Sequence, residues 1–251
     1  NCLALQNVNL SNFDTYLCQN LEGMFQGCTT LSTVDLSSFT FYSWPSVTNV
    51  TMKDMFKGCY MLENVKFPAD SFNTIRVTDM SGMFEGCYKL ATIDLSSFNN
   101  PGVNNQTNAE LPITFTAQAM FKDCKSLTNV QLAGFDVSGC NSFEEMFKGC
   151  NVMTTIDITS FNAPNVQTAA GMFEGCTALR SISFPARMNT TSLADTSNMF
   201  MQCYALRSIE LGALNVANTT NMAGMFMNCT ALQTLDLSFW TWNTATGVTA
   251  T

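Results

Sequence analysis

The chain has 251 residues, of which 46% are apolar and 12% are charged, and 19 acidic residues outnumber 11 basic residues to give a net charge of −8. This apolar content is enough for a substantial core and excludes a disordered acidic tail. The acidic balance argues against nucleic acid as a partner, and the absence of histidine excludes imidazole-dependent catalysis and histidine metal ligands.

The first residues of the chain form a shortened copy of a repeat, residues 1–13, with Cys2, Val8 and Phe13 in a spacing that returns later. Eight longer units follow, each marked by a Met-Phe dipeptide, starting near Met24, Met55, Met83, Met120, Met146, Met172, Met199 and Met225. The last five starts lie 26 or 27 residues apart, and longer steps indicate insertions at about 40–49 and 99–112. We therefore predict a single repeat domain over residues 1–251 with about nine units of ~26 residues.

Each unit places apolar residues at fixed distances from its Met. In the unit of Met83 these are Cys87, Leu90, Ile93 and Leu95, and Phe98 closes the frame. A repeat of this length predicts a solenoid, because one unit cannot bury its apolar face without its neighbours. The alternation at Ile93 to Leu95 predicts a short strand, and stacked units then share one parallel sheet.

The Met-Phe segment has a different period. Val77, Met80, Met83, Phe84 and Cys87 recur at steps of three and four, which is typical of one or two helical turns. A glycine stands just before the repeat cysteine in several units, where a helix end would need positive φ: Gly58, Gly86, Gly149 and Gly175. The prediction is an α/β solenoid, a right-handed coil with one parallel sheet face and short helices on the opposite face.

The same residues resemble a known family. The frame from Leu90 to Phe98 is similar to the leucine-rich repeat consensus, and the full run from Met83 to Phe98 resembles the BspA-like repeats of bacterial and protist surface proteins. This resemblance implies a leucine-rich-repeat-like fold and a non-enzymatic adhesin or host-binding protein at the cell surface. It implies no ligand. Units two and six depart from the pattern, with Pro68 and Pro185 just after the strand.

Eleven cysteines require an explanation. Nine occupy one repeat position, and the other two, Cys18 and Cys140, stand six residues before a Met, where other units carry small hydrophobic residues. We predict buried thiols, with one or two disulfides or a metal site as alternatives. Cysteines in a row do not form the tetrahedron that zinc needs, so we predict no metal and no other cofactor.

One column of side chains should face outward from the sheet. It contains five acids among neutral and basic residues: Asp35, Asp94, Asp157, Glu210 and Asp236. The column forms either a solvated face that avoids repulsion or a shallow acidic groove for a cation or polar ligand. Paired-carboxylate glycosidase chemistry is a third alternative.

The insertions offer further candidates. The first contains Phe41, Tyr42 and Trp44, which either anchor a ligand or fold back over the edge of the solenoid. Asn49 and Asn105 stand in glycosylation sequons, and they are the candidate acceptors if the source glycosylates proteins.

These features favour two functions. The first is a non-enzymatic extracellular or cell-surface binding and adhesion module that holds a protein or glycan. The second is a structural component that self-associates through uncapped solenoid ends into a filament, coat or matrix. We predict no catalytic residues, and no apolar run reaches the roughly 20 residues of a membrane helix.

Overall fold

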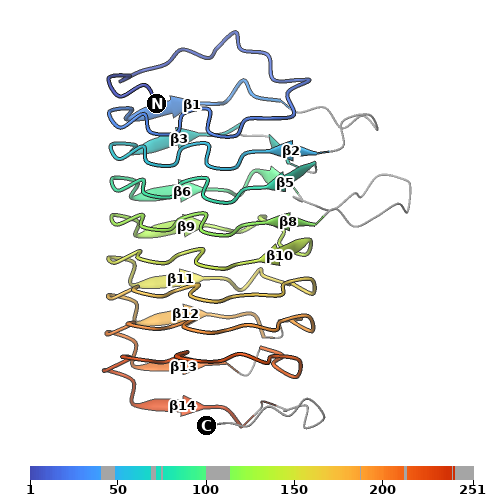
Figure 1. Ribbon diagram of the computed structural model, residues 1–251, viewed down its shortest axis with the longest axis vertical. Helices are drawn as coiled ribbons and strands as arrows, with labels where there is room; N and C mark the ends of the chain where they lie inside the picture. Colours follow the sequence, from blue (N-terminus) through green and yellow to red (C-terminus); the bar gives the residue numbers. More distant parts are fainter. Residues whose placement is uncertain are drawn as a thin grey trace, which may run out of the picture.

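The computed structural model describes residues 1–40, 49–68, 72–74, 76–99, 114–186, 188–211, 214–238 and 240. The chain winds as a stack of similar coils along one long axis, with the N-terminal coils at one end and the last strand at the other (Figure 1). The described strands are β1 Thr33–Asp35, β2 Val50–Thr51, β3 Asn64–Lys66, β4 Phe72–Asn73, β5 Val77–Asp79, β6 Thr92–Asp94, β7 Phe98–Asn99, β8 Phe115–Thr116, β9 Asn129–Gln131, β10 Cys140–Ser142, β11 Thr155–Asp157, β12 Ser181–Ser183, β13 Ser208–Glu210 and β14 Thr234–Asp236.

Three-residue strands form one face of the stack, called here the strand face: β1, β3, β6, β9, β11, β12, β13 and β14. Each has Val, Ile or Leu between two exposed residues, and the middle side chain is buried in six of the eight. The strands pair in parallel two by two, β1 with β3, β6 with β9, β11 with β12 and β13 with β14, and identical repeat positions lie opposite each other, as Ile93 with Val130. The predicted parallel pairing, with Asp94 facing outward, is confirmed, but the face consists of four two-stranded sheets rather than one continuous sheet.

A second parallel ladder runs along the other side of the stack (Figure 1). β2, β5, β8 and β10 form a four-stranded sheet in the order β10-β8-β5-β2, and single bridges extend it in both directions. It passes through the residue four before each repeat Met: Asn20, Thr51, Asp79, Thr116, Ser142, Thr168, Asp195 and Asn221. A third, shorter row pairs β4 with β7 and Met188 with Leu214. The prediction of one sheet face was therefore incomplete.

The predicted short helices are wrong, because the described residues contain no helix and the Met-Phe segments form runs of β-turns. In the first unit the Cys28 N–H donates to the Phe25 carbonyl three residues earlier, at 3.0 Å. Gly27 between them has a φ of 68°, as the third residue of a type II turn requires. The prediction of positive φ just before the repeat cysteine is thus correct, but the residue stands in a β-turn and not at the end of a helix.

Hydrogen bonds between coils explain why no helix forms. An α-helix uses every N–H for a bond to the carbonyl four residues earlier. Here the Phe25 N–H donates instead to the Met55 carbonyl of the next coil at 2.9 Å, and Gly27 N–H donates to Lys57. Alternate N–H groups leave the segment in this way. The turns still direct side chains inward at steps of three and four, which is the spacing that favoured a helix.

The strand recurs eight times, so nine equivalent units are not supported. Residues 1–13 make turns, with Leu5 N–H donating to Cys2 and Phe13 N–H to Leu10. Asn9 accepts the Ser11 N–H on its side chain at 3.0 Å, and no β-bridge joins this part of the described chain to β1. The partial copy therefore covers the stack without adding a strand. Nothing in the described residues has the length and apolarity of a membrane-spanning helix.

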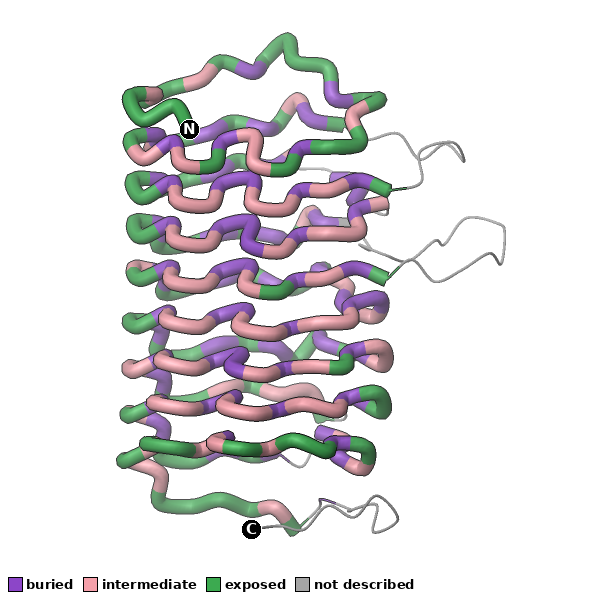
Figure 2. Tube along the Cα trace, viewed as in Figure 1, coloured by how far each residue is buried: buried purple, intermediate pink, exposed green. Residues whose placement is uncertain are grey.

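The core contains a continuous stack of phenylalanines, one from each Met-Phe dipeptide: Phe25, Phe56, Phe84, Phe121, Phe147, Phe173, Phe200 and Phe226. Adjacent ring centroids lie 5.4 to 5.7 Å apart with planes within 11°. Stacked rings contribute about 0.5–1.5 kcal/mol per pair beyond burial. In Figure 2 buried segments, in purple, recur in successive coils of the stack.

The repeat cysteines lie beside this stack. From Cys59 on, each S–H donates to the carbonyl of the repeat phenylalanine in the preceding coil, at 3.0 to 3.3 Å. None of the eleven cysteines forms a disulfide, and eight are buried. The prediction of buried thiols is confirmed for these eight. Cysteine has the volume of a small hydrophobic residue and a thiol that is a weak hydrogen-bond donor, and both properties suit this position.

The phenylalanine stack predicts a large local contribution to stability. Phe121→Ala should lower the free energy of unfolding by about 3–5 kcal/mol, because it opens a cavity between two stacked rings. Tyr204→Ala, which truncates an exposed ring, should change it by no more than about 0.5 kcal/mol. Urea denaturation followed by circular dichroism measures both. Equal losses would contradict the stack.

Candidate functional site

The strand face presents two exposed columns of side chains. The first column is small and polar, with one residue from each strand: Thr33, Asn64, Thr92, Asn129, Thr155, Ser181, Ser208 and Thr234. The second column contains the predicted acids. Because the strands of each pair lie in register and the pairs follow one another along the stack, each column is a row with one side chain per coil, about 4.8 Å apart.

All five acids lie exposed on this face as predicted: Asp35, Asp94, Asp157, Glu210 and Asp236. In the ladder Asp35 lies opposite Lys66, and their charged groups are 3.3 Å apart. Asp94 lies opposite Gln131, and Glu210 lies opposite Asp236, the one directly paired set of acids on the described face. The structure thus places the acids in one row but does not gather them into a pocket. Their binding role stays a prediction.

The aspartates of this row also stabilise their own turns. Each accepts the backbone N–H two residues later, as Asp94 does from Ser96 at 2.8 Å. The hydroxyl and backbone N–H of Thr159 lower the pKa of Asp157, and those of Ser37 and Ser238 do the same for Asp35 and Asp236. A local structural role therefore explains why Asp recurs here.

These bonds predict an acid-sensitive fold. A carboxylate with a lowered folded pKa stabilises the fold above its unfolded pKa, about 4, and the contribution is lost as pH falls through the folded pKa. Asn keeps an oxygen that accepts the N–H but does not titrate in this range. The triple variant Asp35→Asn, Asp157→Asn, Asp236→Asn should therefore lose less thermal stability than the parent between about pH 5 and 2. Parallel curves for the two proteins would contradict this account.

Other predicted site residues fall elsewhere. Phe41, Tyr42 and Trp44 lie outside the described residues, as does Asn105, so their roles stay predictions. Most of the two insertions, at about 40–49 and 99–112, also lies outside the described residues. Asn49 is described and exposed just before β2.

An exposed aromatic pair lies at the edge between the cysteine column and the strand face. The rings of Tyr60 and Tyr88 stack with centroids 4.8 Å apart and planes 5° apart. The Lys125 ammonium lies 4.6 Å from the Tyr88 centroid. The sequence held the signal for this contact, because all three residues directly follow a repeat cysteine and so share one column. Sequence reasoning did not single out this contact.

The buried repeat thiols from Cys59 to Cys203 are unsuited to nucleophilic chemistry. Burial raises the pKa of Cys59 to about 12 and raises that of Cys87 well above its ordinary value. A thiol must ionise to attack, so these groups are inert near neutral pH. In the described part of the chain, no three Cys, Asp or Glu side chains converge as metal ligands.

Thiol reactivity should follow this burial. In the native protein Cys2, the exposed cysteine, should react rapidly with a disulfide reagent, and half-buried Cys18 and Cys229 more slowly. Denaturant should release all eleven thiols that the sequence contains. Cys2→Ser should remove the fast phase alone. Fewer than eleven thiols in denaturant would reveal disulfides and contradict the assignment.

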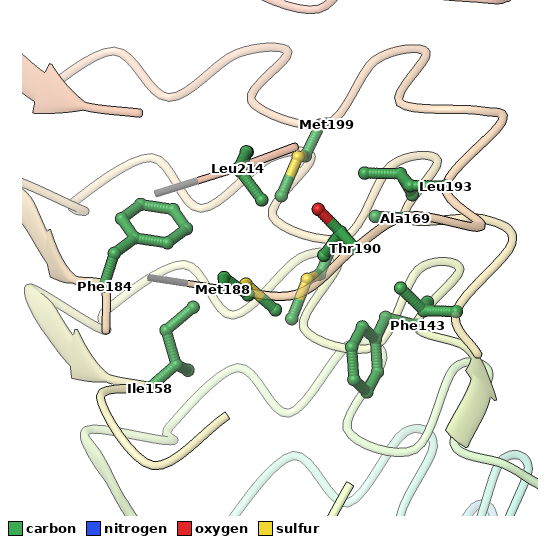
Figure 3. Close-up of a pocket in the computed structure, with 11 residues that line it drawn as sticks. Phe143, Ile158, Ala169, Phe184, Met188, Thr190, Leu193, Met199 and Leu214 are labelled. Atoms are coloured by element: carbon green, nitrogen blue, oxygen red, sulfur yellow. The ribbon is translucent and has the colours of Figure 1, made fainter. Parts of the chain in front are cut away.

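A gap of about 10 Å³ lies inside the stack beside Phe184 and Met188 (Figure 3). It occurs in unit six, where the sequence lacks the usual aromatic residue. In unit two Phe72 fills the corresponding space, with its ring 5.2 Å from Phe98. Side chains facing the gap are apolar except Thr190. The space suits at most one water molecule and is a packing defect rather than a ligand site.

The geometry defines the class of the protein as a parallel β-solenoid with one leucine-rich-repeat-like strand per coil. The family described as "Mycoplasma protein of unknown function, DUF285" matches residues 1–110, 113–184 and 182–250. The chain therefore belongs to this family.

Solved structures with similar folds are leucine-rich repeat proteins. The T. pallidum leucine-rich repeat protein TpLRR is 16% identical with a TM-score of 0.38, and the match covers 84% of this chain and 70% of that one. A leucine-rich cell surface protein from Faecalibacterium prausnitzii is 16% identical with a TM-score of 0.27, covering 84% and 74%. A leucine-rich repeat protein from Bacteroides ovatus is 18% identical with a TM-score of 0.25, covering 86% and 69%. Among curated proteins no sequence matches the chain.

Proposed function

We propose that the chain is a non-enzymatic binding and adhesion module, displayed on a cell surface or outside the cell, that holds a protein or glycan. The observation that supports this function is the straight, in-register array of exposed polar side chains along the strand face. Such an array suits a long macromolecular ligand, which contacts many coils at once. The BspA-like character of the repeat from Met83 to Phe98 points to the same class.

The thiol chemistry is compatible with an extracellular location. Free thiols outside a cell are at risk of forming wrong disulfides, because the environment is oxidising. Exchange requires thiolate, and burial raises the pKa of Cys124, Cys150 and Cys176 well above its usual value. The repeat column thus tolerates such an environment without crosslinks. Protease treatment of intact cells tests the location, since a surface protein is lost while a cytoplasmic marker survives.

A binding screen tests the function itself. The labelled chain is applied to arrays of glycans and of extracellular matrix proteins, and saturable binding to at least one probe is expected. The double variant Thr92→Gln, Thr155→Gln adds bulk to the strand face without charge and should weaken that binding several-fold, because each side chain now obstructs the contact surface.

A matched control makes the same exchange away from this face. Thr40→Gln, Thr220→Gln alters two exposed threonines and should leave binding unchanged. Equal losses in both doubles would contradict the strand face as the binding surface. Absence of saturable binding, together with fibres or sheets in electron micrographs, would contradict the module and favour the self-assembling structural component.

A further inference from the structure

Four of the five described cations that make no ion pair lie on one edge of this acidic protein. Five described lysines make ion pairs with carboxylates: Lys53, Lys57, Lys66, Lys122 and Lys148. Apart from Arg76, the described cations without an ion pair are Lys89, Lys125, Arg180 and Arg207. All four are exposed and lie within four residues after a repeat cysteine. We call these turns, between the cysteine column and the strand face, the turn edge.

The turn edge is the exposed border at the left of each coil in Figure 2. Its position follows from the repeat, because the residues between the buried cysteine and the buried strand must cross the surface there. It also carries three tyrosines, Tyr60, Tyr88 and Tyr204, which are 44%, 37% and 43% exposed. A row of cations and phenols therefore extends over several coils, with one exposed carboxylate among them, that of Glu63, four residues after Cys59.

The stacked pair Tyr60 and Tyr88 presents donors rather than ring faces. The two rings cover one another at 4.8 Å, and the Lys125 ammonium lies over the Tyr88 ring. Within the described residues neither phenolic hydroxyl bonds to the protein. An aromatic edge carries partial positive charge, and free hydroxyls and ammonium groups donate hydrogen bonds. Every one of these groups favours an anion.

The adjoining surface favours a saccharide. The small polar column of the strand face begins only a few residues beyond the turn edge, with Thr92 and Asn129 exposed in the coils of Tyr88 and Lys125. Hydroxyl and amide side chains pair with sugar hydroxyls, whereas an acidic peptide offers few such groups. A polysaccharide with anionic groups at intervals meets both the cations and this column.

We infer that the turn edge around Tyr60, Tyr88, Lys89 and Lys125 docks a linear sulfated or carboxylated polysaccharide. This inference rests on the proposed binding function and names its ligand class. The protein's net charge of −8 repels a polyanion at long range, so attraction depends on local contacts. Binding should weaken as salt rises, because ions screen exposed charges.

The test uses heparin as a sulfated polysaccharide probe, with affinity measured by calorimetry at low and moderate salt. Lys89→Gln, Lys125→Gln should weaken binding by about tenfold or more. Lys53→Gln, Lys57→Gln changes the net charge equally on the paired lysines and should weaken it less than about twofold. Tyr60→Phe, Tyr88→Phe keeps the ring stack and should give an intermediate loss. Circular dichroism verifies that each variant is folded.

Several outcomes would overturn the inference. Equal losses in the two lysine doubles would show non-specific attraction, and absence of heparin binding would remove the ligand class. Binding of polyglutamate as tightly as heparin would assign the edge to an acidic peptide instead. These failures are distinct from failure of the proposed function, because the array screen can still detect a ligand that depends on Thr92 and Thr155.

Discussion

Hydrogen bonds between the backbones of successive coils hold this molecule together and fix its other features. Along each Met-Phe segment, one N–H closes a turn within the coil and the next donates to the neighbouring coil, as Phe56 does to Met83. Pairing in this register stacks each residue on its counterpart in the next repeat. Phenylalanine therefore meets phenylalanine, and each repeat cysteine from Cys59 on donates to a carbonyl in the preceding coil.

The same register places equivalent positions of successive units about one coil apart, so that like charges at these positions would repel each other. The sequence avoids this repulsion by alternating acidic and basic residues. On the Met-Phe side Lys57 pairs with Glu85 at 2.9 Å, and Glu145 accepts both Lys122 and Lys148. Exposed pairs of this kind contribute little to stability, so their main effect is to permit the stacking. Within the described residues, the cations of the turn edge make no such ion pair.

Sequence reasoning located the strands and the inward columns because burial at Val34 or Ile93 leaves an alternating pattern within one unit. It mistook the turns for helices because both direct side chains inward at steps of three and four. A helix and this run of turns differ in the hydrogen bonds that the turns donate to the next coil. The sequence of a single unit does not show those bonds. One signal was present: Gly, Asn or Asp often stands both just before the Met and three residues after it, as at Asp54 and Gly58, where φ is positive.

The candidate sites show the same division. The acids were placed correctly from the frame, but the turn-closing bonds of Asp94 and its counterparts depend on backbone geometry beyond the strand. The contact of Lys125 with Tyr88 needed the two units to be aligned side by side, since the residues lie far apart in sequence. The insertion containing Trp44 breaks the frame, so periodicity says nothing of its conformation.

Distances along the stack test the central claim most directly. Nitroxide amino acids incorporated at exposed strand-face positions, without thiol labelling, allow pulsed electron resonance to measure the separation of chosen coils. In-register parallel stacking predicts about 19 Å between Thr33 and Thr155, four coils apart, and about 34 Å between Thr33 and Thr234, seven coils apart. Separations that do not grow in proportion to the number of coils would contradict the account.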